Sequence, residues 1–174
     1  MIGDILDWVR PVLVDTPTRW KNLTEALPAE LLMRRPAPSE WPAVDCLQHL
    51  VDTERWVFPV RIKAFLSGQS FPAFDPDHEG TRPDAALSPA ALAAEFARLR
   101  LESLNVLTTV TVSDLDKRNH HPELGPVTLS ELIHEWAAHD LMHTVQAERA
   151  VMQPFIAGSG PWRIYFTDHI AKQA

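Results

Sequence analysis

Three histidines are the residues of this chain whose types and spacing point most directly to chemistry. His139 and His143 bracket the segment HDLMH, so they stand at an i, i+4 spacing. On a helix, this spacing places both imidazoles on one face, one turn apart. His49 lies far upstream, in another stretch with helical periodicity. Two helices packed side by side could bring three neutral imidazoles together, which is a ligand set for a divalent metal with open coordination positions.

The histidine pair alone has other readings. Two imidazoles on a buried helix face need polar partners or a metal. Carboxylates such as Glu54 or Glu135 could supply hydrogen bonds instead. Gln146, which follows His143 by about one turn, is either a hydrogen-bond partner near the site or an ordinary polar residue of the helix.

Other residues with reactive or metal-binding side chains are expected outside the site. Cys46 stands close to His49 in the sequence, but cysteine is often buried as a small apolar residue. Asp140 points about 100° away from His139 on a helix, so we expect a solvated or outer-sphere acid. The other histidines are expected at the surface or in polar loops: His78, His120, His121, His134 and His169.

The elements that must position the three histidines are helices. Apolar residues recur at helical spacing over residues 2–26, 41–67, 88–110 and 128–152. Pro11 and Pro17 predict a kink or break in the first helix, and Pro59 predicts a kink in the second. The TTVTV stretch near the end of the third favours strand locally, but a lone strand would have no partner, so helix is retained.

Capping signals set the ends of these helices. Pro42 suits the first position of the second helix, and Gly68 is expected to end that helix. The third helix is expected to begin at Ser88-Pro89 and the fourth at the Thr128–Glu131 capping box. The fourth helix should end before Pro154. With no convincing strand, the chain is predicted to be an all-α four-helix bundle with a short extra helix over 162–172, in a single domain spanning 1–174.

Composition narrows the class of protein. A net charge of −7 argues against general nucleic-acid binding, which needs a basic surface. A single cysteine rules out an internal disulfide and fits a reducing compartment. No stretch approaches ~18 consecutive apolar residues, so no membrane span is expected. With no apolar run at the N-terminus either, we expect a cytoplasmic protein.

The two histidine segments carry a family resemblance. WPAVDCLQHLVDTERW, around His49, resembles the first helix motif of the DinB/YfiT-like superfamily, and HEWAAHDLMHTVQAERAV resembles its second, His-x-x-x-His followed by Gln. The resemblance spans the whole chain, and one departure is Pro42, where the family often has a capping Ser or Thr. It implies a four-helix bundle, a homodimer, and a zinc or nickel site formed by His49, His139 and His143.

The resemblance also implies a reaction class. Relatives include transferases that use low-molecular-weight thiols, so we expect a metal-dependent enzyme that activates a thiol cosubstrate, or water, against a small-molecule substrate. The loop over 68–87 is a candidate substrate cover, with Trp56 and Phe74 as apolar walls. The alternative is a stress-associated metal-binding or dimeric scaffold protein without turnover.

Overall fold

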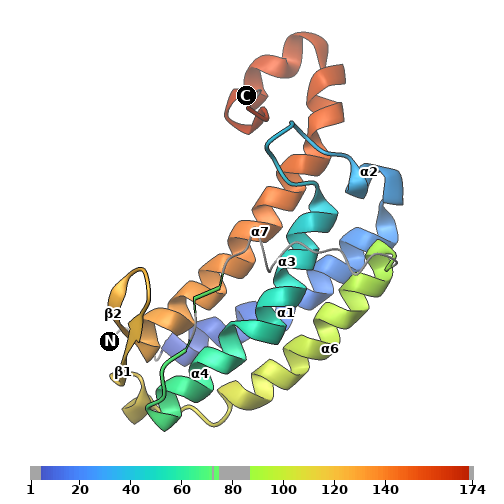
Figure 1. The fold of residues 1–174 in the computed structure, drawn as a ribbon. Helices are drawn as coiled ribbons and strands as arrows, with labels where there is room; N and C mark the ends of the chain where they lie inside the picture. Colours follow the sequence, from blue (N-terminus) through green and yellow to red (C-terminus); the bar gives the residue numbers. More distant parts are fainter. Residues whose placement is uncertain (1–4, 72, 75–86, 173–174) are drawn as a thin grey trace.

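The structure, a computed structural model, describes residues 5–71, 73–74 and 87–172, and it is dominated by long helices (Figure 1). The all-α four-helix bundle predicted from the sequence is confirmed. Its rods are α1 (Ile5–Ala26), α3 (Ala43–Trp56) continued by α4 (Phe58–Ser67), α6 (Pro89–Leu107) and α7 (Leu129–Gly158). Short α2 (Ala29–Met33) links the first two rods.

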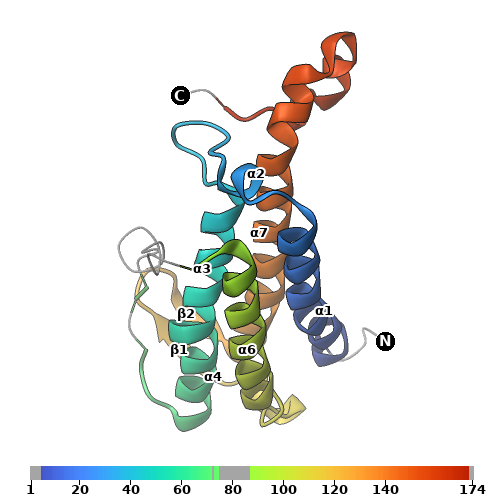
Figure 2. The ribbon, with the colours of Figure 1, turned by 90° about the vertical axis from the view of Figure 1, so that its right-hand side faces the viewer.

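The rods are not arranged in sequence order around the bundle. Helix α1 packs against α6 and α7, and α3 packs against the same two helices. Helices α1 and α3 therefore occupy opposite corners, as do α6 and α7 (Figures 1 and 2). The two helices that carry the histidines, α3 and α7, are direct neighbours because of this order.

The interior has two apolar cores separated by a polar layer. One core gathers around Leu13, Phe58 and Trp136, and the other around Trp20 and Phe96. Along each rod, the residues between these cores include buried polar side chains: Thr16 on α1, Glu54 on α3, Arg100 and Ser103 on α6, and Asp140 and His143 on α7. The polar layer thus crosses the whole bundle at one level.

The prolines act differently in the first two rods. A break in the first helix was the wrong expectation, since α1 runs unbroken through Pro11 and Pro17. Proline at position 17 has no N–H for the carbonyl of Leu13, and Arg100 Nη1 donates to that oxygen instead, at 2.8 Å. The second rod is interrupted near Pro59, as expected, because α3 ends and α4 begins around Val57.

Most helix ends follow the capping signals. Gly68 ends α4 in the left-handed region with φ of 70°, and the Ser88 side chain caps α6 by accepting from the amide of Ala91. The Thr128–Glu131 capping box is present at the start of α7. Pro42 precedes the first helical residue of α3 rather than occupying it.

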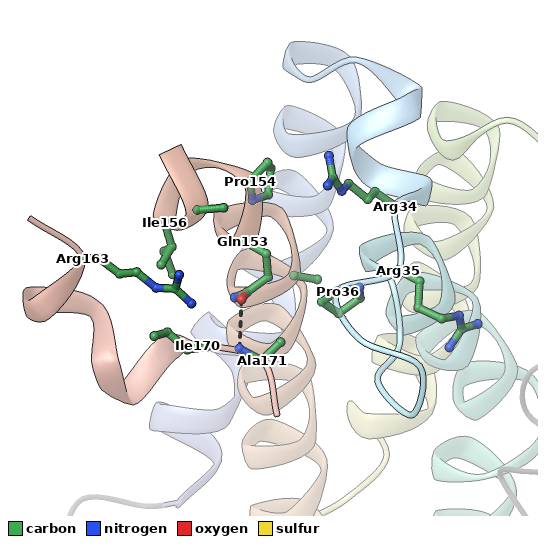
Figure 3. Close-up of a pocket in the computed structure, with 11 residues that line it drawn as sticks. Arg34, Arg35, Pro36, Gln153, Pro154, Ile156, Arg163, Ile170 and Ala171 are labelled. Atoms are coloured by element: carbon green, nitrogen blue, oxygen red, sulfur yellow. Dashed lines mark hydrogen bonds between the residues drawn. The ribbon is translucent and has the colours of Figure 1, made fainter. Parts of the chain in front are cut away.

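The end of α7 was predicted too early. The helix continues through Pro154 to Gly158, because a proline in the last turns removes only one helical hydrogen bond and Ile156 beyond it is buried. A 3₁₀ helix, η2 (Gly160–His169), follows where a short extra helix was expected. The chain then folds back so that the Ala171 amide donates to Gln153, beside a cavity of about 200 Å³ (Figure 3).

A small sheet contradicts the expectation of no strands. Helix α6 ends at Leu107 rather than near residue 110, and a short 3₁₀ turn, η1 (Val112–Asp114), leads to a hairpin. Strand β1 (Arg118–His121) pairs antiparallel with β2 (Gly125–Thr128). The partner of β1 is β2, which follows it after a tight turn with Gly125 at φ of 78°. The sequence prediction had assumed that a strand in this region would have no partner.

A helix that crosses a membrane must be both long and apolar. In the part of the chain that the structure describes, no helix combines the length and apolar character needed to cross a bilayer.

Candidate metal centre

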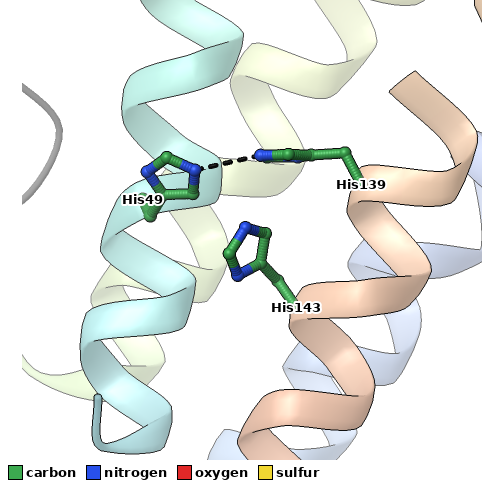
Figure 4. A group of neighbouring side chains, drawn as sticks. All are labelled: His49, His139 and His143. Atoms are coloured by element: carbon green, nitrogen blue, oxygen red, sulfur yellow. Dashed lines mark hydrogen bonds between the residues drawn. The ribbon is translucent and has the colours of Figure 1, made fainter. Parts of the chain in front are cut away.

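His49, His139 and His143 lie together between α3 and α7, in the polar layer (Figure 4). One ring nitrogen from each side chain lies within 4.8 Å of those of the other two. The Nε2 atoms of His49 and His139 are 2.9 Å apart, and the ring centroids of His139 and His143 are 4.5 Å apart. The convergence expected from the sequence is therefore present in the fold.

The helices place these rings by their apolar periodicity. His49 is only 5% exposed, and it lies on α3 between the buried residues Leu47 and Leu50. On α7, His143 is also 5% exposed, and His139 is half-buried one turn earlier. The inward stripe of α7 continues with Ala147, so the histidines occupy positions where a bundle helix ordinarily places apolar side chains.

Aromatic rings surround the cluster. The Trp41 ring stacks on His143, with centroids 5.9 Å apart and an interplanar angle of 16°, and Phe58 meets His139 edge-on at 5.3 Å. Phe74 lies 6.4 Å from His49, in agreement with its predicted role as an apolar wall. Trp56 is 63% exposed and is not one of these rings, so that assignment was wrong.

The predicted substrate cover, the loop over 68–87, is described by the structure only in part. Residues 72 and 75–86, which include His78, lie outside the described residues. Of the 68–87 segment, Phe74 is the described residue whose ring contacts the histidine cluster.

Hydrogen bonds define how the rings are oriented. Gln146 Oε1 lies 2.9 Å from Nδ1 of His143, so this nitrogen donates and Nε2 keeps its lone pair. Of the two roles considered for Gln146, the structure thus shows the hydrogen-bonding one. In the described part of the chain, Nδ1 of His139 is buried without a hydrogen-bond partner.

Burial favours the neutral form of two of these imidazoles. The pKa of His139 is lowered to about 2, mainly by burial and additionally by the neighbouring His143, His49 and Arg100. Burial also lowers the pKa of His143, against the hydrogen bond that His143 donates to Gln146. Neutral imidazole is the form that coordinates a metal, so burial favours the required protonation state at His139 and His143.

The donor set fits a borderline divalent metal. Zinc–imidazole bonds of ~2.0–2.1 Å imply nitrogen separations of roughly 3.3 Å in a tetrahedral site. The cluster spans separations from 2.9 Å to at most 4.8 Å, so small ring movements would satisfy this geometry. Cys46 is not among the described side chains that lie within reach of the same ion, and burial raises the pKa of its thiol to about 12. Three nitrogens alone leave coordination positions open.

Asp140 and Glu54, two of the three acids considered in the sequence analysis, belong to a different cluster. Arg100 bridges them, with Nη1 and Nη2 bonded to Asp140 at 2.7 and 2.9 Å and Nη2 bonded to Glu54 at 2.8 Å. Trp136 Nε1 also donates to Glu54 at 2.9 Å. Asp140 is fully buried rather than solvated, and Glu54 is used by Arg100 and Trp136. Sequence reasoning missed Arg100, whose position on α6 gives no local signal.

The remaining histidines lie apart from the cluster. His120, His134 and His169 are exposed, as expected. His134 bonds to the carbonyl of Ser130 at the start of α7. His121 is on strand β1 and accepts two backbone amides at Nδ1, so it is a structural part of the hairpin rather than a free loop residue.

Comparisons with known proteins agree with this fold. The chain is similar to YfiT from Bacillus subtilis, described as a probable metal-dependent hydrolase with an unusual four-helix bundle topology. The two share 18% sequence identity and a TM-score of 0.77, over 89% of this chain and 90% of that one. A search of the curated proteins finds no match. The profile of the DinB superfamily matches residues 13–147, and the chain belongs to this superfamily.

Proposed function

We propose that the protein is a metal-dependent enzyme whose divalent ion, zinc or nickel, is held by His49, His139 and His143. The observation that carries this proposal is the convergence of three imidazoles, two buried and one half-buried, without a carboxylate or thiolate among them. Such a donor set leaves positions for a substrate atom, and a bound ion would supply Lewis acidity and lower the pKa of water or a thiol.

The surrounding residues support such chemistry. Gln146 fixes the tautomer of His143, so that its Nε2 lone pair faces the other rings. Trp41, Phe58 and Phe74 form an apolar wall that would exclude water and strengthen electrostatic interactions at the site.

Two reaction types share this geometry. Hydrolysis would use an activated water, and YfiT is described as a probable metal-dependent hydrolase. Transfer to a low-molecular-weight thiol would use an activated thiolate against an electrophilic small molecule. The three-histidine site suits both, because an open position accepts either oxygen or sulfur.

The homodimer is also a proposal, and it rests on the family resemblance. The apolar stripe of α6, which could have served as a dimer face, is buried within this chain, as Leu92, Phe96 and Leu99 show. Sedimentation velocity at micromolar concentration tests the association, and a single monomeric species would contradict it.

The test of function combines metal content with activity. The purified protein is analysed for bound metals, reloaded with zinc or nickel, and screened against ester and amide substrates and against thiol–electrophile pairs. We expect one divalent ion per chain and turnover that His139→Ala abolishes but His134→Ala retains. A stoichiometrically bound ion with no turnover in either screen would favour the non-catalytic scaffold.

A further inference from the structure

A second pocket lies beside the candidate metal centre, between α4, the hairpin and the first turns of α7. Its volume is about 220 Å³, and apolar side chains line most of it: Phe65, Phe71, Leu124, Val127 and Leu132. Glu135, on its border, precedes His139 by four residues, which is a rise of ~6 Å along a helix. None of the three clustered histidines lines the pocket, so it is a separate site.

Arg61 gives this pocket a cation that forms no ion pair with the described residues. The side chain is half-buried, and its guanidinium carbon lies 5.1 Å from the centroid of the Phe71 ring. It makes no hydrogen bond or ion pair within the part of the chain that the structure describes, although most buried guanidinium groups are paired. Burial lowers its pKa, against the attraction of Glu135 and Glu123. The group is therefore partly desolvated and retains its donors.

The nearby acids Glu135 and Glu123 attract Arg61, but neither forms an ion pair with it in the described part of the chain. Glu131 is engaged in the capping box, where it accepts the amide and the hydroxyl of Thr128. Glu135 is exposed as a residue, yet its carboxyl group borders the pocket, and burial there raises its pKa to about 7. A raised pKa means that this carboxyl group carries less negative charge near neutral pH.

The hairpin contributes a further donor. His121 accepts the amides of Glu123 and Leu124 at Nδ1, so in the neutral ring the proton is on Nε2. Its ring meets Phe71 edge-on at 6.0 Å, and both residues line the pocket. The pocket therefore combines aromatic walls with N–H donors from two elements.

We infer that this pocket binds a small apolar carboxylic acid, with its carboxylate on Arg61 and its hydrocarbon body against Phe65, Phe71 and Val127. Guanidinium and carboxylate match in geometry and charge, and the Arg–carboxylate pair is a strong charge-assisted interaction. Apolar cavities of ~150 Å³ accept benzene, so a pocket of this size suits a single-ring acid. The site needs no metal and stands independently of the proposed reaction.

The binding test uses phenylacetate as the probe and phenylacetamide as its uncharged counterpart. Two-dimensional NMR of the protein as purified measures chemical-shift changes during titration with each compound. We expect phenylacetate to shift the signals of Phe71, Val127 and Leu132 and to bind at least about tenfold more tightly than the amide. Equal affinities, or shifts located elsewhere, would overturn the assignment.

Variants separate the cation from the cavity. Arg61→Gln should weaken phenylacetate binding about tenfold or more, whereas Lys63→Gln, an exposed cation on the same helix, should leave it unchanged. Val127→Phe should fill the pocket and weaken both compounds. Retention of phenylacetate binding in Arg61→Gln would refute the proposal, and the metal content of these variants is measured alongside, so that failure here is distinct from failure of the metal centre.

Discussion

The polar layer of the bundle holds two clusters that differ in how their polar atoms are satisfied. The Arg100 cluster is closed in charge: Arg100 is 1% exposed and bonds to Asp140, Glu54 and the carbonyl of Leu13, although Arg100 Nε and Glu54 Oε2 have no hydrogen-bond partner in the described part of the chain. The histidine cluster is open: the rings contact mainly one another, and Nδ1 of His139 has no partner in the described part of the chain. Both clusters join α3 to α7.

The difference separates a structural role from a binding role. In the Arg100 cluster, charges of opposite sign from three helices and a carbonyl from the fourth meet at one group, so the charges are paired within the protein. In the histidine cluster, three like groups bring one ring nitrogen each within 4.8 Å of the others, which is a donor set that a divalent cation would complete. Asp140 and His139 are adjacent, yet helix geometry assigns them to different clusters.

The largest expected effect comes from opening the closed cluster. Arg100→Met leaves Glu54 and Asp140 buried without their cation, so we expect a loss of ~3–5 kcal/mol in the free energy of unfolding. Urea denaturation measures this loss. Arg98→Met is the control, since Arg98 forms exposed pairs on the same helix and should cost less than ~1 kcal/mol. Similar losses in both variants would mean that the closed cluster has no special weight.

The next effect comes from removing a ligand of the open cluster. At a zinc concentration ~100 times the dissociation constant, a bound ion stabilises the fold by ~2.7 kcal/mol. His139→Ala and His49→Ala should lose most of this increment, while exposed His134→Ala keeps it. Melting temperature with and without zinc, together with metal content, provides the readout. Full metal retention in both ligand variants would remove the shared site from consideration.

Acid should affect the open cluster through proton binding in the unfolded chain. The pKa of His139 is about 2 in the folded protein, against ~6.5 when unfolded. Between these values the unfolded chain binds a proton that the folded one does not, so stability falls as pH drops, by up to ~1.4 kcal/mol per unit. Above pH ~6.5 both states are neutral and this contribution vanishes.

The measurement is the unfolding free energy of metal-free protein between pH 4.5 and 6.5, a range in which the unfolded chain binds a proton at residue 139 and the folded chain does not. His139→Gln should show a shallower decline than the unaltered protein, because the titrating group is gone. Because His134 is exposed, the His134→Gln variant should retain the full decline in unfolding free energy. Identical slopes in all three proteins would show that His139 is not held neutral by burial.

The same comparison explains what the sequence could predict. The histidine cluster could be predicted because i, i+4 spacing is a local pattern and because the helices that carry the histidines have strong apolar periodicity. The Arg100 cluster was not visible, since it depends on which helices become neighbours. Pro17 illustrates this: the sequence marks it as a helix breaker, but the structure supplies Arg100 for the Leu13 carbonyl that the proline leaves free. The hairpin was missed because its strands are short and strongly polar.

The smallest expected effect concerns the hydrogen bond between the open cluster and its support. Gln146 Oε1 accepts from Nδ1 of His143, which keeps the Nε2 lone pair directed at the other rings. Gln146→Leu removes the acceptor with little change in volume, so the ring would lose its preferred tautomer and orientation. Loss of such a supporting partner typically weakens metal binding ~10–100-fold.

Competition titration with a coloured chelator measures the zinc dissociation constant of this variant. Gln153→Leu is a suitable control, because Gln153 lies on the same helix but bonds to the C-terminal segment instead. Gln146→Glu should restore or exceed the original affinity, since a carboxylate accepts the same hydrogen bond and adds negative charge. An unchanged affinity in Gln146→Leu would mean that Trp41, stacked on the ring, is sufficient to orient His143.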